Sequence, residues 1–143
     1  MNTPRSRGPV VVDTDVYGAQ LTGSLLAVWY QSVIAARPVF LSFQTVAELR
    51  FGAALRGWGS ARLLKLEARI VAAEIVHSGP ELIESYARLR VECWRAGHAL
   101  AQKEHNADRW VAATAIRLQV PLVSNDGIFV NTPGLTLESV PAD

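Results

Sequence analysis

Apolar positions along this chain form short runs and longer spaced patterns, which separate strands from helices. Val10–Val12, Val39–Ser42 and Pro121–Ser124 are short apolar runs, typical of buried strands. Glu74–His77 and Leu135–Val140 are weaker matches to the same pattern. We therefore expect up to five strands.

Longer segments with apolar residues at helical spacing lie between these strands. The predicted helices are Leu25–Ala36, Thr45–Leu55, Ser60–Ala72, Pro80–Gly97 and Ala107–Leu118. Thr45 is expected to cap the second helix, with Glu48 completing a capping box, and Asn106 is expected to cap the last. Strands that alternate with helices imply βαβ units and a parallel sheet.

The composition indicates one soluble, cytoplasmic domain over residues 1–143. Half of the residues are hydrophobic, and the net charge of +1 means that any polyanion site is a local patch. Residues 1–9 are polar and expected to be flexible, and we find no signal peptide and no membrane-spanning segment. The single cysteine, Cys93, is expected to be a buried thiol and excludes an internal disulfide.

Four acidic residues, Asp13, Glu48, Asp108 and Asp126, stand where a strand or loop leads into a helix. In parallel sheets a ligand crevice lies beyond the carboxyl ends of the strands, so these side chains can converge there. Gathered carboxylates repel one another and need a cation, and oxygen ligands suit Mg²⁺ or Mn²⁺. The pattern predicts metal-assisted phosphodiester chemistry.

Each acid also has a purely structural interpretation. Asp13 could cap the following turn, and Glu48 could be half of a capping box. Asp108 could complement a helix dipole, and Asp126 before Gly127 is a common turn pair. Shared metal binding explains all four positions at once.

Four segments resemble, in order, the motifs of PIN-domain nucleases, with the VapC toxins of bacterial type II toxin–antitoxin pairs as the most similar branch. They are Val11–Val16 (VVDTDV), Val46–Gly52 (VAELRFG), His105–Ala115 (HNADRWVAATA) and Leu122–Phe129 (LVSNDGIF). The resemblance spans about Val10 to Val140.

The resemblance implies a three-layer α/β/α sandwich around a mostly parallel sheet of four to five strands. It implies an Mg²⁺- or Mn²⁺-dependent endoribonuclease that forms a homodimer and is inhibited by a VapB-like antitoxin. By position, Asp13, Glu48, Asp108 and Asp126 would be the catalytic, metal-binding acids. Ser124 matches a position where the family often has Ser or Thr, and Asp15 stands where Asn is usual.

Surfaces for RNA and protein partners are less defined in the sequence. Arg50 and Arg56 are the main candidates for RNA phosphate contacts, and Trp58 could stack on a base or pack on the antitoxin. The helices Thr45–Leu55 and Ser60–Ala72 are expected to form the antitoxin groove. Excess aromatic surface, from Trp29, Tyr30, Trp94 and Trp110, suggests a symmetric dimer interface.

Two alternatives remain open at this stage. Val10–Val16 also fits the first motif of haloacid-dehalogenase-like phosphatases, in which Asp13 would be a nucleophile and Asp15 an acid. The later Gly-Asp signature of that superfamily is missing around Asp126, and Glu48 and Asp108 would have no role. The other alternative is a PIN-like scaffold that binds RNA or protein without cutting.

Overall fold

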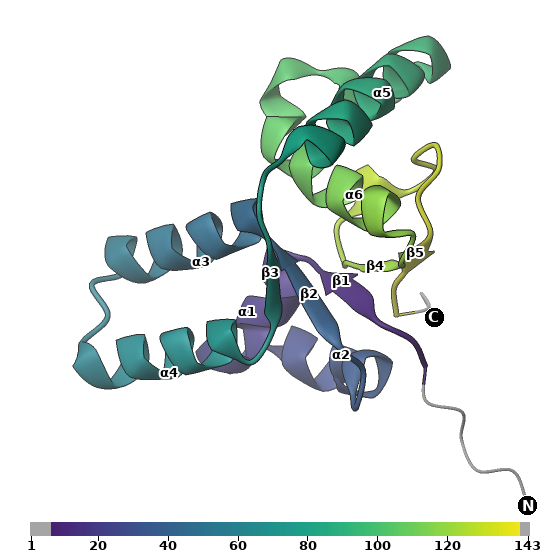
Figure 1. Ribbon diagram of the computed structural model, residues 1–143. Helices are drawn as coiled ribbons and strands as arrows, with labels where there is room; N and C mark the ends of the chain where they lie inside the picture. Colours follow the sequence, from purple (N-terminus) through teal and green to yellow (C-terminus); the bar gives the residue numbers. More distant parts are fainter. Residues whose placement is uncertain (1–6, 141–143) are drawn as a thin grey trace, which may run out of the picture.

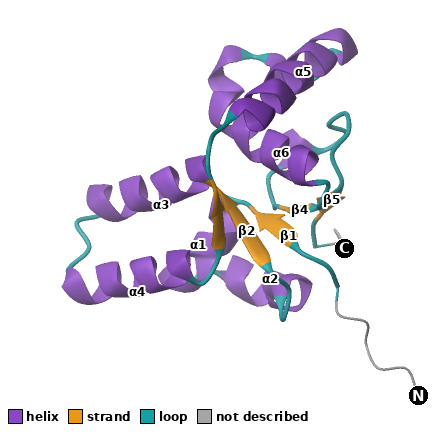
Figure 2. Ribbon diagram, in the orientation of Figure 1, coloured by secondary structure: helices purple, strands orange, loops and turns teal. Residues whose placement is uncertain are grey.

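A computed structural model describes residues 7–140 of the chain. Its centre is a parallel sheet of five strands in the order β3-β2-β1-β4-β5, drawn in orange in Figure 2. The strands are β1 (Val10–Val12), β2 (Val39–Ser42), β3 (Glu74–Val76), β4 (Leu122–Val123) and β5 (Leu137–Glu138). All four strand pairs are parallel, which confirms the expected sheet.

Six α-helices cover the two faces of this sheet (Figure 1). They are α1 (Thr14–Thr22), α2 (Leu25–Ile34), α3 (Phe43–Leu55), α4 (Ser60–Val71), α5 (Pro80–Ala96) and α6 (Asn106–Leu118). Three 3₁₀ turns accompany them: η1 (Ala99–Ala101), η2 (Lys103–His105) and η3 (Gly127–Phe129).

The apolar core is divided by the sheet into two halves. On one side, α1 to α4 pack against Val10 and Val12 of β1. On the other side, α5 and α6 pack against Val11 of the same strand, with Cys93 fully buried among them as expected. Alternate residues of the central strand therefore point into different halves, which confirms the three-layer α/β/α sandwich.

Helix α1 is absent from the sequence-based prediction. Its segment has small and polar residues without a clear apolar stripe, so helical periodicity gives no signal. Its two ends explain why it forms. The Asp13 side chain caps the first turn, and Gly23 ends the helix in the left-handed conformation, with φ of 69°.

Two predicted helix caps are wrong. Helix α3 begins at Phe43, and Ser42 is its N-cap, with the Ser42 hydroxyl accepting from Gln44 N over 3.2 Å. Thr45 is therefore fully buried inside the helix, and no capping box forms with Glu48. Asn106 is the first residue of α6 rather than its cap, because its side-chain oxygen accepts from Tyr86 and Arg109 instead.

The ends of the chain add little to this picture. The predicted flexible segment, residues 1–9, falls mostly on residues 1–6, which lie outside the described part. Among the described helices, none has the length and apolar character needed to cross a membrane.

Candidate active site at the carboxyl edge of the sheet

Asp13 lies at the centre of the site, where the central strand β1 ends beside β4. It is 7% exposed, and both of its carboxylate oxygens are hydrogen-bonded. Oδ1 accepts from Thr14 N over 2.8 Å, and Oδ2 accepts from the Ser124 hydroxyl over 2.8 Å. The two strand ends thus hold one buried carboxylate in a fixed orientation.

The electrostatics of this carboxylate are unusual. Burial raises the pKa of Asp13 from 3.8 to about 7, against the lowering effect of the bonds from Ser124 and Thr14. The negative charges of Asp15 and Asp108 raise it further. The pKa of Asp15 is also raised, first by burial and then by Asp126 and Asp108. Asp13 and Asp15 therefore lie within electrostatic reach of Asp108, and Asp15 also within reach of Asp126.

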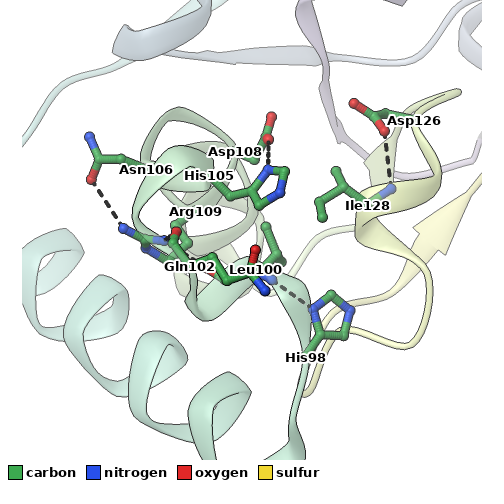
Figure 3. A network of polar contacts seen from close by, with 9 residues as sticks. All are labelled: His98, Leu100, Gln102, His105, Asn106, Asp108, Arg109, Asp126 and Ile128. Carbon is green, nitrogen blue, oxygen red and sulfur yellow. Dashed lines mark hydrogen bonds and ion pairs between the residues drawn. The ribbon is translucent and has the colours of Figure 1, made fainter.

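Asp108 and Asp126 approach this edge from two further elements (Figure 3). Asp108 is in the first turn of α6, where its Oδ2 lies 3.1 Å from His105 Nδ1. Asp126 caps η3, with Oδ1 accepting from Ile128 N over 3.0 Å, and its own N–H donates to the Ser124 hydroxyl over 3.0 Å. Ser124 thus connects the carboxylate of Asp13 to the backbone of Asp126.

Glu48 joins the site through Thr14. The Thr14 hydroxyl donates to Glu48 Oε2 over 2.8 Å, while Oε1 accepts from Gln44 over 3.4 Å. Thr14 stands between Asp13 and Asp15, so the bond ties α3 to the start of α1. The sequence reasoning missed Thr14, although its place between two acids in the first motif was the available signal.

A cavity of about 230 Å³ opens beside these residues. Thr14, Asp15 and Glu48 line its polar side. Its apolar walls come from four leucines of α1 to α4, Leu21, Leu26, Leu49 and Leu66. Arg56 and Trp58 complete the lining. The cavity therefore links the acidic edge to an apolar space between the helices on one face.

The two candidate arginines differ in their surroundings. Arg56 lines the cavity, and its guanidinium lies so close to Gly52 that a Cβ there would come within 2.9 Å of Nη1. Arg50 instead forms an exposed ion pair with Glu67, at 3.0 and 3.1 Å. Trp58 packs against the core with the Arg62 guanidinium 5.3 Å from its ring. Of the two arginines, only Arg56 is placed with the site residues.

The donor set fits a hard divalent cation. Within residues 7–140, no Arg or Lys forms an ion pair with Asp13, Asp15, Asp108 or Asp126. In the same part of the chain, no three acidic, His or Cys side chains are grouped closely enough to enclose an ion by themselves. Mg²⁺ suits such an open arrangement, because it keeps several waters and needs only one or two direct carboxylate ligands.

Comparison with known proteins finds one matching family model and several solved structures of similar fold. The family model described as PIN domain matches residues 10–135. Among solved structures, VapBC2 from Rickettsia felis bound to a promoter DNA fragment is similar with a TM-score of 0.75 and 21% identity, over 92% of this chain and 98% of that chain. No curated protein sequence matches.

Two further solved structures have higher identity. FitAcB from Neisseria gonorrhoeae is 25% identical, with a TM-score of 0.73, over 90% of this chain and 95% of that chain. VapBC-5 from Mycobacterium tuberculosis, a member of the VapBC family of toxin–antitoxin systems, is 27% identical, with a TM-score of 0.65, over 94% and 98% of the two chains.

Proposed function

Because this chain belongs to the PIN-domain family, we propose that it is a divalent-metal-dependent endoribonuclease and the toxin of a type II toxin–antitoxin pair. The observation that supports this most is the convergence of Asp13, Asp15, Asp108 and Asp126 at one edge of the sheet, with no Arg or Lys paired to them among residues 7–140. Glu48 borders the same edge through Thr14.

Asp13, Glu48, Asp108 and Asp126 would hold Mg²⁺ or Mn²⁺, with Asp15 as an additional carboxylate. The bound ion would supply a nucleophilic water near neutral pH and stabilise the charge of the leaving oxygen. Ser124 and Thr14 act by orienting carboxylates, since each hydroxyl donates to one of them. A fixed orientation matters because even a small displacement of a catalytic group lowers the reaction rate steeply.

Metal-dependent cleavage of RNA by the purified chain tests the enzymatic part of this proposal. Asp13→Asn keeps the size and one of the two acceptor oxygens but removes the charge, so we expect a folded protein that cuts RNA at least 100-fold more slowly in Mg²⁺ or Mn²⁺. Asp108→Asn should lose activity in the same way. Full activity of a folded Asp13→Asn protein would contradict the assignment.

The cavity beside the site suggests how an antitoxin would inhibit the enzyme. Its polar side carries Asp15 and Glu48, which a guanidinium could bridge. The neighbouring helices α3 and α4 expose several apolar side chains, namely Phe51, Leu55, Leu63 and Leu64. We propose that a VapB-like antitoxin covers this surface with an apolar helix and places an Arg in the cavity.

Co-expression with the small protein encoded beside this chain tests the partner. The expected complex survives moderate salt and cuts RNA more slowly than the free chain. Phe51→Asp should release the partner while leaving cleavage intact, because Phe51 is not among the residues that line the cavity beside the acidic edge. Failure to co-purify, or a complex as active as the free chain, contradicts inhibition by this partner.

The family membership excludes one alternative and leaves the other testable. A haloacid-dehalogenase-like phosphatase would have no use for Glu48 and Asp108, whereas the PIN-domain match includes both. A non-catalytic scaffold would bind RNA without needing a metal ion. RNA binding that is unchanged by chelation, with no cleavage at any metal concentration, would favour that alternative.

A further inference from the structure

Among residues 7–140, Arg109 has one of the largest fully buried side chains, and it directly follows Asp108 in the first turn of α6. Only 1% of its surface is exposed. Within the described residues, no carboxylate forms an ion pair with its guanidinium. Burying a charge is costly unless hydrogen bonds compensate it, so the contacts of this guanidinium indicate its role.

The guanidinium joins three separate elements. Nη1 donates to the carbonyls of Leu100, over 2.7 Å, and of Gln102. Nε and Nη2 donate to the Tyr86 hydroxyl on α5, over 3.1 and 2.9 Å, and Nη2 reaches Asn106 Oδ1 over 3.5 Å. One side chain thus connects α5, the segment with η1 and η2, and the first residue of α6.

The Tyr86 hydroxyl is itself held in place. Its ring stacks on Trp110 with centroids 4.0 Å apart, and Trp110 meets Phe43 of α3 edge-on at 5.4 Å. The hydroxyl also donates to Asn106 Oδ1. The acceptor that receives two of the Arg109 bonds is therefore a fixed point.

The start of α6 lacks an ordinary side-chain cap. His105 occupies the N-cap position, and its side chain accepts no hydrogen bond from the first turn. Instead the His105 ring contacts Asp108 Oδ2 at 3.1 Å (Figure 3). The segment that places His105 is the one whose carbonyls Arg109 binds.

We propose that Arg109 is a positioning residue for Asp108. By fixing the segment before α6 and the first turn of the helix, it holds the backbone and the His105 contact that orient the Asp108 carboxylate. The effect on metal binding rests on the proposed function, whereas the effect on the first turn of α6 does not. Residues that do not touch the metal but hold its ligands in place typically contribute about 10- to 100-fold to metal affinity or activity.

Two variants separate this role from a general loss of stability. Arg109→Lys keeps the charge but loses the planar fork that binds two carbonyls and a hydroxyl together. Tyr86→Phe keeps the ring on Trp110 and removes only the hydroxyl. Arg37→Lys is the control, because Arg37 is also buried, donates to the carbonyls of Gly8 and Val33 besides its ion pair with Glu138, and precedes β2 at the amino ends of the strands.

The measurements are Mn²⁺ affinity by titration, amide hydrogen exchange across residues 106–110, RNA cleavage and thermal unfolding. For Arg109→Lys we expect a 10- to 100-fold weaker Kd for Mn²⁺, a similar loss of cleavage and faster exchange in the first turn of α6. Tyr86→Phe should show the same changes in smaller size. Arg37→Lys should unfold at a lower temperature but keep its Mn²⁺ affinity.

Wild-type Mn²⁺ affinity in a folded Arg109→Lys protein would overturn the proposal, as would an equal loss in Arg37→Lys. If the wild-type chain neither binds Mn²⁺ nor cuts RNA, the proposed function fails instead. Hydrogen exchange then still decides whether Arg109 holds the first turn, and unchanged exchange in Arg109→Lys would overturn that part.

Discussion

The hydroxyl of Ser124 donates to Asp13 Oδ2 over 2.8 Å, joining the ends of the two neighbouring strands β1 and β4. Ser124 is 1% exposed, so water cannot readily replace this bond. The bond lowers the pKa of Asp13, which burial raises to about 7. The Ser124 hydroxyl therefore helps to keep Asp13 ionised near neutral pH, in the form that the proposed cation would need.

Ser124→Ala should shift the pH dependence of cleavage. Without the hydroxyl, the pKa of Asp13 rises further, so a higher pH is needed to ionise it. A hydrogen bond to a charged group contributes about 1.5–3 kcal/mol, and we expect kcat/KM at pH 7 to fall about 10-fold. The loss should shrink as the pH rises to 8.5, when Asp13 is ionised again.

The control for this prediction is Ser124→Thr, which keeps the hydroxyl. The PIN-domain resemblance places either Ser or Thr at this position, so Ser124→Thr should retain the wild-type pH profile. An Ala variant with the wild-type pH profile would show that the Ser124 bond does not govern the charge of Asp13.

Asp13→Asn should stabilise the metal-free protein at neutral and higher pH. The pKa of Asp13 is about 7 in the folded chain and 3.8 ordinarily, so the folded state binds a proton that the unfolded chain releases. Folding is therefore penalised as the pH rises from 4 to 7, by an amount on the order of 4 kcal/mol at pH 7 and above. Asn removes this penalty because it does not ionise.

Chemical unfolding with a chelator present, at pH 4.5 and pH 8, measures the effect. The wild type should lose stability relative to Asp13→Asn as the pH increases, and the two should converge at the lower pH. Lower stability of Asp13→Asn at pH 8 would mean that the hydrogen bond from Ser124 to Oδ2, which the Asn amide nitrogen cannot accept, stabilises the fold more than the buried charge destabilises it.

The strand positions and the convergence of the aspartates were predictable from the sequence. Continuous apolar runs such as Val10–Val12 indicate buried strands, and parallel strands bring their carboxyl ends to one edge. Asp13 and Asp126 could be expected there for that reason, and Asp108 because it lies in the first turn of the helix that leads back to β4. The resemblance to the PIN-domain motifs made the assignment of these residues to a site more specific, because four motifs occur in the family order.

The contacts that orient these acids could not be predicted. The Thr14 bond to Glu48 depends on how α1 meets α3, and α1 itself has no apolar stripe. The predicted capping box does not form because the helix begins at Phe43, with Ser42 rather than Thr45 as its N-cap. The burial of Arg109 could not be predicted either, since only the folded segment around Leu100 and Gln102 provides its acceptors.

Arg56→Ala should weaken RNA binding more than Arg50→Ala. Arg56 lines the cavity with Asp15 and Glu48, whereas Arg50 is engaged with Glu67 on an exposed surface. Basic side chains near the site supply phosphate contacts, so we expect KM to rise about 3- to 10-fold and its salt dependence to weaken in Arg56→Ala. Arg50→Ala should change KM less than 2-fold. Equal effects of both variants would indicate nonspecific charge attraction.

The free chain should form a symmetric homodimer through the exposed face of α5. Tyr30, which the sequence suggested as interface surface, is 1% exposed and binds the Ser124 carbonyl, so it belongs to the core. Trp94 is 73% exposed, and Ile83 and Val91 are two further exposed apolar side chains on the same helix. A large exposed apolar face of this kind marks an interaction site, and two copies of α5 can cover each other in an isologous contact.

Trp94→Glu should therefore give a monomer in light scattering at micromolar concentration, where the wild type is a dimer. Trp29→Glu is the matched control, because Trp29 is also exposed, at 51%, but lies on α2 on the other face of the sheet. It should remain a dimer. Retention of the dimer by Trp94→Glu and its loss in Trp29→Glu would move the interface to α2, and a monomeric wild type would contradict self-association altogether.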